Sequence, residues 1–224
     1  TQLRKLTASD AQGGDYFGIF VAISGNYAIV SAYASDEPND SGSAYIFNVQ
    51  SGTQLHKLTA SDAASSDNFG SGVAISGNYA IVGAYANDDN GSASGSAYIF
   101  NVQSGTQLRK LTASDAQGGD YFGSGVAISG NYAIVGAYYD DSKRGAAYVF
   151  NVQSGTQLHK LIASDRGVDD EFGVSVGIDG KYAIVGARFD DDSANASGSA
   201  YIFDVQTNTQ LHKLVASDPE QLVY

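Results

Sequence analysis

Aspartates are the residues of this chain whose types and spacing could do chemistry. Asp88 and Asp89 stand together, and Asp190, Asp191 and Asp192 form a second run. Calcium takes about six to eight oxygen ligands from closely spaced groups of this kind, so these five are the candidate metal ligands. The simpler interpretation is that acidic loops keep the protein soluble and that Asp, Asn, Ser and Gly shape the turns.

Three asparagines offer a site for covalent modification. Asn39, Asn90 and Asn195 each begin the Asn-X-Ser pattern of N-glycosylation. All three belong to the same kind of loop in a repeated unit. We expect them to carry sugar if the chain passes through a eukaryotic secretory pathway.

Catalytic groups are hard to find. Residues 173–177, GVSVG, fit the nucleophile-elbow pattern, but they align with residues 70–74 of another repeat, an expected strand and not a strand-to-helix turn. A polysaccharide-processing enzyme would need an asymmetric cluster of acid, base and metal groups, which no single repeat contains. One repeated position holds histidine in three copies and arginine in two: His56, His159, His212, Arg4 and Arg109. We therefore expect this position to be a polar surface site. For the chain as a whole we expect no catalytic residues and no cofactor, with bound calcium as the alternative.

The composition limits the classes of molecule that the chain could bind. The chain of 224 residues has 12 basic and 24 acidic residues and a formal charge of −12. Such a charge repels nucleic acid and anionic membranes, and no apolar run is long enough to span a bilayer. There is no cysteine, so disulfides and thiol chemistry are excluded. The chain opens on Thr1 without a signal-peptide pattern, which we interpret as a piece of something longer.

The elements that must position these residues are repeats. The anchor TQLxKL begins at Thr1, Thr53, Thr106, Thr156 and Thr209, at spacings of 52, 53, 50 and 53 residues. There are thus four full units and an additional copy of the anchor strand.

Each unit divides into four short β segments. In the third unit these are residues 126–129, 132–138, 145–152 and 156–161. A Ser-Gly-Asn turn joins the first two segments, and a Gln-Ser-Gly turn joins the last two. The second segment is apolar at odd and even positions, and the two leucines of TQLxKL point to opposite faces, so both faces need cover. A four-stranded meander that is covered on both faces and recurs about every 50 residues predicts a β-propeller blade.

The repeated Phe-Gly followed by an apolar strand and Val-Gly-Ala resembles the FG-GAP repeat of the integrin α-subunit N-terminal propeller. The first unit departs from it, with Val30-Ser31-Ala32. The resemblance implies an extracellular or cell-surface protein and a ring that usually has seven blades. It also implies calcium between the first and second strands of a blade, but Ser-Gly-Asn stands there, so that site is not carried over. The matching pairs are Phe17-Gly18, Phe69-Gly70, Phe122-Gly123 and Phe172-Gly173.

The chain is therefore predicted to be all-β, one FG-GAP β-propeller domain over 1–224 built of four four-stranded antiparallel blades. The blades cover about 11–60, 61–113, 114–163 and 164–216, with 1–10 as a spare outer strand and 217–224 as a tail. Because the spare strand has no blade of its own, we expect a larger assembly or a longer parent protein.

The long loops should meet at one end of the blades. All acidic residues except Asp179 and Asp204 fall in these loops, and seven of the 12 basic residues lie on outermost strands. This distribution predicts an acidic loop face and a basic rim. Tyr33, Tyr85 and Tyr138 approach the same face, where they either cap the core or stack on a sugar ring.

These features favour a non-catalytic extracellular interaction, adhesion or structural module that presents the acidic loop face. Its partners would be other proteins or copies of itself, without nucleic acid and without membrane insertion. The alternative is a calcium- or glycan-binding lectin-like propeller, and a polysaccharide-processing enzyme is a third possibility.

Overall fold

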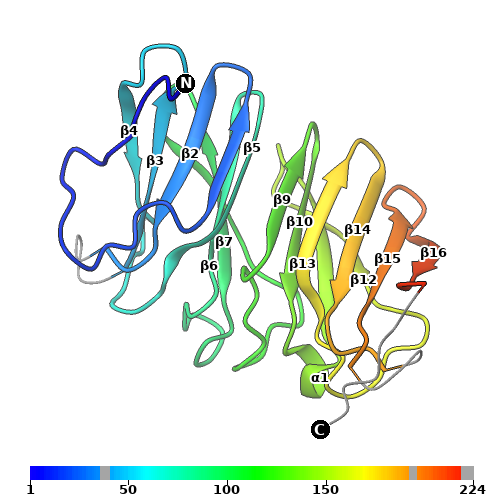
Figure 1. Ribbon diagram of the computed structural model, residues 1–224. Helices are drawn as coiled ribbons and strands as arrows, with labels where there is room; N and C mark the ends of the chain where they lie inside the picture. Colours follow the sequence, from blue (N-terminus) through cyan, green and yellow to red (C-terminus); the bar gives the residue numbers. More distant parts are fainter. Residues whose placement is uncertain (36–40, 192–195, 218–224) are drawn as a thin grey trace, which may run out of the picture.

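The structure is a computed structural model that describes residues 1–35, 41–191 and 196–217. Its strands form four antiparallel sheets of four strands, and in each sheet the strands follow one another in chain order (Figure 1). The predicted all-β propeller of four four-stranded blades is confirmed. The strands are β1 Val21–Ser24, β2 Tyr27–Ala32, β3 Ser43–Asn48 and β4 Gln54–Leu58 in blade 1; β5 Phe69–Ser76, β6 Tyr79–Ala84, β7 Ser96–Asn101 and β8 Gln107–Leu111 in blade 2; β9 Val126–Ser129, β10 Tyr132–Ala137, β11 Ala146–Asn151 and β12 Gln157–Leu161 in blade 3; and β13 Phe172–Asp179, β14 Tyr182–Ala187, β15 Ser199–Asp204 and β16 Thr209–Leu214 in blade 4. Among the described residues there is one helical turn, α1, which covers Asp140–Lys143.

Tight turns set the register of each blade. Ser24 pairs with Tyr27, which leaves a two-residue turn of Gly25 and Asn26. Gly25 has a φ of +56°, a left-handed backbone that glycine adopts without steric cost. The expected hairpins are therefore present, and they bring every first strand alongside its second strand.

The core lies between neighbouring blades. Ile29 of β2 packs in one buried cluster with Phe69 and Ile75 of the next blade. Phe69 also packs edge to face on Phe100, with ring centroids 5.8 Å apart. We call the face of a blade that packs on the preceding blade, such as the Ile75 face, its leading face. The opposite face, such as the Ile29 face of blade 1, is its trailing face.

In blades 3 and 4 the Phe-Gly pair rests on two glycines of the preceding blade. A Cβ atom added to Gly83 would lie 1.9 Å from the carbonyl oxygen of Gly123, and one added to Gly95 would lie 1.9 Å from that of Phe122. Backbone atoms of the next blade therefore fill the space that side chains would occupy. This contact explains why the same glycines recur in the repeat.

The outer strands depart from the expectation that both leucines are covered. Leu58 is 1% exposed, but Leu55 is 39% exposed. The pairing of β3 with β4 shifts by one residue, so that Ile46 faces His56 while Phe47 faces Gln54. This bulge removes Leu55 from the regular ladder and leaves its side chain on the surface.

The blades stand in a row, with β5 in contact with β1 and β9, and β13 in contact with β9. Blade 1 and blade 4 lie at opposite ends of this row (Figure 1). Their outward faces remain exposed, as Ile23 at 67% and Ile184 at 44% show. Over the described part of the chain, no helix has the length and apolar character needed to cross a membrane.

Candidate functional site at the loop end

The loops between second and third strands and the connections between blades gather at one end of the molecule (Figure 1). A lysine of each outer strand points into this end. It forms an ion pair with an aspartate of the connection that precedes its own blade, and the pairs are Lys57–Asp10 at 2.6 Å, Lys110–Asp62 at 2.5 Å, Lys160–Asp115 at 2.7 Å and Lys213–Asp165 at 2.8 Å. The predicted basic rim is therefore wrong for these four lysines, because they reach the acidic loops and offset part of their charge.

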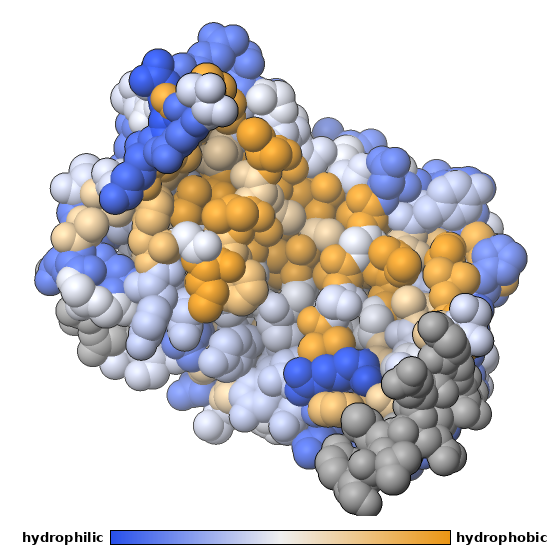
Figure 2. All heavy atoms as spheres, in the orientation of Figure 1, coloured by the Kyte–Doolittle hydropathy of each residue, from blue (hydrophilic) through white to orange (hydrophobic). Residues whose placement is uncertain are grey.

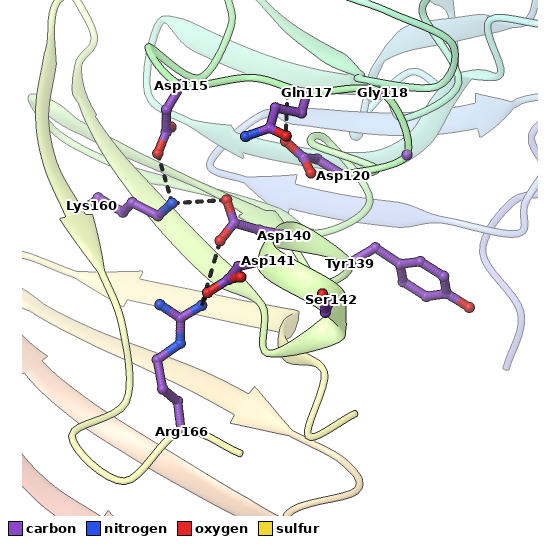
Figure 3. Close-up of a pocket in the computed structure, with 11 residues that line it drawn as sticks. Asp115, Gln117, Gly118, Asp120, Tyr139, Asp140, Asp141, Ser142, Lys160 and Arg166 are labelled. Atoms are coloured by element: carbon purple, nitrogen blue, oxygen red, sulfur yellow. Dashed lines mark hydrogen bonds and ion pairs between the residues drawn. The ribbon is translucent and has the colours of Figure 1, made fainter. Parts of the chain in front are cut away.

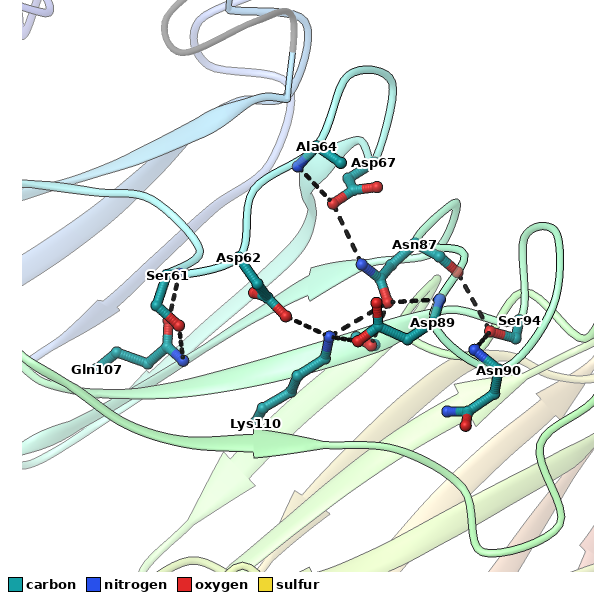
Figure 4. Close-up of polar contacts among 11 residues, drawn as sticks. Ser61, Asp62, Ala64, Asp67, Asn87, Asp89, Asn90, Ser94, Gln107 and Lys110 are labelled. Carbon is teal, nitrogen blue, oxygen red and sulfur yellow. Dashed lines mark hydrogen bonds and ion pairs between the residues drawn. The ribbon is translucent and has the colours of Figure 1, made fainter.

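Blade 2 shows this arrangement in detail (Figure 4). Lys110 bridges Asp62 of the connection and Asp89 of the β6–β7 loop. Burial alone would lower the pKa of Lys110, but the hydrogen bonds to both carboxylates outweigh it and raise that pKa. For Asp62, burial would raise the pKa, and the hydrogen bond from Lys110 lowers it below the ordinary value. Both groups are thus held in their charged forms.

Blade 3 encloses a cavity of about 400 Å³ at the same end (Figure 3). Lys160 bridges Asp115 and Asp140 across it, at 2.7 and 2.8 Å. Asp140 is buried and also accepts a hydrogen bond of 2.9 Å from the hydroxyl of Tyr148. Asp120 lines the same cavity, and burial raises its pKa. Arg166 lines it too and pairs with Asp140 at 3.7 Å and with Asp141 at 3.0 Å. The lining therefore holds four aspartates against two cations, Lys160 and Arg166.

The predicted metal ligands have protein partners. Asp88 accepts a 2.7 Å hydrogen bond from the backbone N–H of Ala93, and Asp89 pairs with Lys110. Asp191 is exposed, and Asp192 lies outside the described residues. Over 1–35, 41–191 and 196–217, no group of three or more His, Cys, Asp or Glu side chains could hold a metal ion. Calcium binding stays a prediction that needs a titration.

In blade 4 the ammonium group of Lys213 lies beside Asp190, where a metal ion would have to bind. The buried carboxylate of Asp190 accepts hydrogen bonds from Ser199 at 2.7 Å, Tyr201 at 2.8 Å and Lys213 at 3.0 Å. Burial would raise the pKa of Asp190, but these bonds outweigh it and lower that pKa. The Asp190 carboxylate is therefore charged and already compensated.

The other residues singled out from the sequence are the serine of the nucleophile-elbow pattern, the histidines and the glycosylation asparagines. Ser175 lies within the inner strand β13, as its repeat alignment predicted. His56 contacts the backbone carbonyl of Gln103 through its ring nitrogen Nε2, at 2.8 Å. Asn90 is exposed in the β6–β7 loop, whereas Asn39 and Asn195 lie outside the described residues. The use of the three glycosylation patterns stays a prediction.

Tyrosine rings lie in two groups at the loop end. Tyr16 stacks on Tyr33 in blade 1, and Tyr121 stacks on Tyr138 in blade 3, with ring centroids 5.7 Å apart in both pairs. Tyr85 of blade 2 packs edge to face on Tyr121, with centroids 5.6 Å apart. We call these five residues, together with Tyr139, the tyrosine track. Tyr139 packs on both Tyr121 and Tyr138 and also lines the acidic cavity, so the part of the track in blades 2 and 3 adjoins the cavity.

Two tyrosines of the track have an unusual backbone. Tyr16 and Tyr121 precede the Phe-Gly pair with φ values of +52° and +55°, and Asn68 has +57° at the same place in blade 2. Asparagine adopts this left-handed conformation more readily than a bulky residue does. Glu171 has +55° at this place in blade 4, so the left-handed conformation recurs in all four blades. In blades 1 and 3 a bulky aromatic residue occupies it against its backbone preference. The repeat pattern predicts Tyr33, Tyr85 and Tyr138 at this face but not Tyr16 and Tyr121, although both stand directly before a Phe-Gly pair.

In blade 4 an ion pair takes the place of the stacked rings. Arg188 binds Glu171 at 2.6 Å, and these residues occupy the positions of Tyr138 and Tyr121. The Arg188 guanidinium also lies 6.0 Å from the centre of the Tyr138 ring. The track thus ends in a charged pair at blade 4.

The fold and this loop end define a β-propeller made of sequence repeats. The FG-GAP repeat family matches residues 1–47, 53–100, 106–150 and 156–203, and the chain belongs to this family. FG-GAP repeats also occur in the β-propellers of integrin α subunits and are typical of extracellular proteins. No curated protein matches the chain.

Solved structures share the fold at low sequence identity. The computationally designed protein Ika4 is 14% identical with a TM-score of 0.56, over 90% of this chain and 98% of that one. The hydrazine synthase of Kuenenia stuttgartiensis is 14% identical with a TM-score of 0.60, over 94% of this chain and 53% of its own. The designed protein Ika8 is 15% identical with a TM-score of 0.54, over 88% of this chain and 61% of its own. At such identities the likeness concerns the fold alone.

Proposed function

We propose that this chain is an extracellular, non-catalytic interaction module that binds its partner through the tyrosine track. The observation that carries the proposal is the pair Tyr16 and Tyr121, aromatic residues kept on left-handed backbone where blade 2 has Asn68. Strained positions of this kind cluster at ligand-binding surfaces. The family supports the class, because FG-GAP propellers are often used in adhesion or binding.

The chemistry of the surface favours a basic protein segment as the partner. Tyrosine provides rigid contact area with a polar hydroxyl and is enriched in protein interfaces. The loops of blades 3 and 4 also carry Asp141 and Asp169, at 55% and 66% side-chain exposure, which pair with Arg144 and Lys143. A basic partner would compete with these two cations for the carboxylates. The net charge of −12 attracts a cationic partner from a distance.

A glycan is the second candidate. Tyr16 is 63% exposed and lies flat against Tyr33, at an interplanar angle of 15°. An exposed aromatic face suits the apolar face of a sugar ring. This candidate predicts that Tyr16 alone carries much of the affinity.

A phage-displayed random peptide library, selected on the immobilised protein, tests the proposal. We expect enriched peptides rich in Arg and Lys, and at least a ~10-fold weaker affinity in the double variant Tyr16→Asn and Tyr121→Asn. Asparagine already occupies this position in blade 2, so the fold should tolerate both changes. Tyr182→Asn is the control, since Tyr182 is 50% exposed on the first turn of blade 4, away from the loop end.

Two outcomes would overturn the protein-binding proposal. One is that no peptide is enriched, and the other is that enriched peptides bind the double variant as tightly as the original chain. A glycan array probed with these three proteins and with the single variant Tyr16→Asn separates the second candidate. Sugar binding that Tyr16→Asn alone removes, without any peptide enrichment, would replace the peptide proposal with the glycan one.

A further inference from the structure

The two ends of the blade row expose opposite halves of the same junction. Inside the row, an isoleucine of a trailing face shares a cluster with an isoleucine of the next leading face. These pairs are Ile29 with Ile75, Ile81 with Ile128, and Ile134 with Ile178. The equivalent residues without a partner are Ile184 at the end of blade 4 and Ile23 at the start of blade 1.

Exposure shows how incomplete these end faces are. Ile134 is fully buried, whereas Ile184 is 44% exposed; Ile75 is 7% exposed, whereas Ile23 is 67% exposed. Leu214 follows the same pattern at 44%, against 1% for Leu161. Large apolar faces of this kind mark interaction surfaces. Figure 2 shows apolar side chains in a band that crosses the molecule from the N-terminal blade to blade 4.

The glycine contacts are open at the same two ends. A Cβ atom on Gly18 would meet nothing within 4 Å, whereas one on Gly123 would lie 2.3 Å from the carbonyl oxygen of Ser96. At the other end, a Cβ on Gly198 would meet only atoms of its own blade, whereas one on Gly145 would lie 1.9 Å from the carbonyl oxygen of Phe172. Among the described residues, therefore, no Phe-Gly pair packs on blade 4, and no blade packs against Phe17-Gly18.

The first residues of the chain already behave as the outer strand of a missing blade. Arg4 donates a hydrogen bond of 3.0 Å to the carbonyl of Gln50, as Arg109 does to that of Gln153 at 2.6 Å. The backbone N–H of Ser9 donates to Gln54, as the equivalent serine does in the next blade. Leu3 is nevertheless 92% exposed, because residues 1–6 have no sheet neighbour.

We propose that blade 4 of one copy binds blade 1 of a second copy, head to tail, through the junction that the chain uses three times internally. Residues 1–9 and 209–217 differ only at Arg4/His212 and Thr7/Val215. Residues 1–9 of one copy therefore have the sequence needed to replace β16 beside β15 of the other. Two copies related by a twofold axis satisfy both open ends of each chain, which closes the assembly. This inference concerns other surfaces than the tyrosine track and does not rest on it.

Native mass spectrometry and sedimentation over a range of concentrations test the proposal. We expect a dimer of two 23.3 kDa chains, and loss of the closed dimer in Ile184→Lys and in Ile23→Lys. Both side chains are exposed in the single chain, so each variant should keep its circular dichroism spectrum. Leu158→Lys is the control, because Leu158 is 39% exposed on β12, away from both end faces.

Mixing the two variants makes the test directional. The Ile184→Lys chain keeps a good leading end and the Ile23→Lys chain keeps a good trailing end, so the mixture should form an open heterodimer with one intact junction. A monomer at every concentration, or association that neither variant weakens, would overturn the proposal. Loss of association in Ile23→Lys but not in Ile184→Lys would also overturn it, since that pattern belongs to a head-to-head contact.

A disulfide trap gives an independent readout, because the chain has no cysteine. Chains carrying only Ile23→Cys and chains carrying only Ile184→Cys are mixed under mild oxidation. We expect the mixed dimer to exceed both symmetric dimers, and a predominance of either symmetric dimer would contradict the proposed contact.

Discussion

The junction between blades 3 and 4 and the open face of blade 4 present the same residues in two environments. Ile134 and Ile184 occupy one repeat position, as do Gly136 and Gly186, yet only the first of each pair has a blade packed on it. The difference teaches that the repeat sequence encodes half-junctions, each of which becomes a core only when the next blade covers it. The stability of a blade is therefore set by its neighbours as much as by its own strands.

The largest expected effect comes from the isoleucine pair. Ile134→Ala should lower the free energy of unfolding by about 3 kcal/mol, because it leaves a cavity in a packed junction. Ile184→Ala should lower it by less than about 1 kcal/mol, since Ile184 is 44% exposed. Urea unfolding at concentrations where the chain is monomeric measures both. Equal losses would show that the face of blade 4 is covered in the single chain.

The glycine pair gives the next effect. A Cβ atom on Gly136 would lie 1.9 Å from the backbone oxygen of Gly173, whereas one on Gly186 would first meet the side-chain oxygen of Ser175 at 2.5 Å. Backbone cannot move aside as a serine hydroxyl can, so Gly136→Ala should cost about 2 kcal/mol and Gly186→Ala less than about 0.5 kcal/mol. Thermal unfolding followed by circular dichroism compares the two variants. A midpoint for Gly136→Ala as high as that for Gly186→Ala would contradict the role given to the Phe-Gly contact.

Much of the fold followed from the sequence because the repeat states each strand four times. The segments expected at 126–129 and 156–161 agree with β9 and β12 within one residue. Their turns contain glycine, and their apolar patterns suit strands covered on both faces. The exposed Leu55 could not be predicted, because the bulge that exposes it depends on the register of β4 against β3.

The loop end was predicted less well. The acidic residues were expected there, but the destination of Lys110 and its equivalents was not, because a strand position does not reveal in which direction a long side chain extends. Tyr121 was missed because its ring contacts residues of two other loops, Tyr85 and Tyr138, which only the arrangement of the blades brings together. Local sequence patterns predict the strands reliably, whereas contacts among loops depend on how all the blades are arranged.

The smallest expected effect concerns acid, and it compares two aspartates with opposite shifts. Burial would raise the pKa of Asp165, but hydrogen bonds from Lys213 and Tyr201 lower it below the ordinary value of 3.8. The ionised form therefore stabilises the fold above about pH 3.8, and this contribution is lost as the pH falls through the lowered pKa. For Asp120, burial raises the pKa, so its contribution is present below 3.8 and is lost as the pH rises through the raised pKa.

Asp165→Asn should consequently flatten the decline in unfolding free energy on the acid side of pH 3.8, and Asp120→Asn should steepen the overall rise in stability with pH. Each change is expected to stay below about 1 kcal/mol, because Asp165 is 34% exposed and solvent screens its ion pair. Urea unfolding at several values between about pH 3 and pH 7 gives both slopes, with Asp179→Asn as the exposed control. If Asp165→Asn left the acid slope unchanged, the Lys213–Asp165 bridge would contribute nothing measurable to stability. The stability of blade 4 would then come from uncharged contacts, those around Ile134 and Gly136 among them.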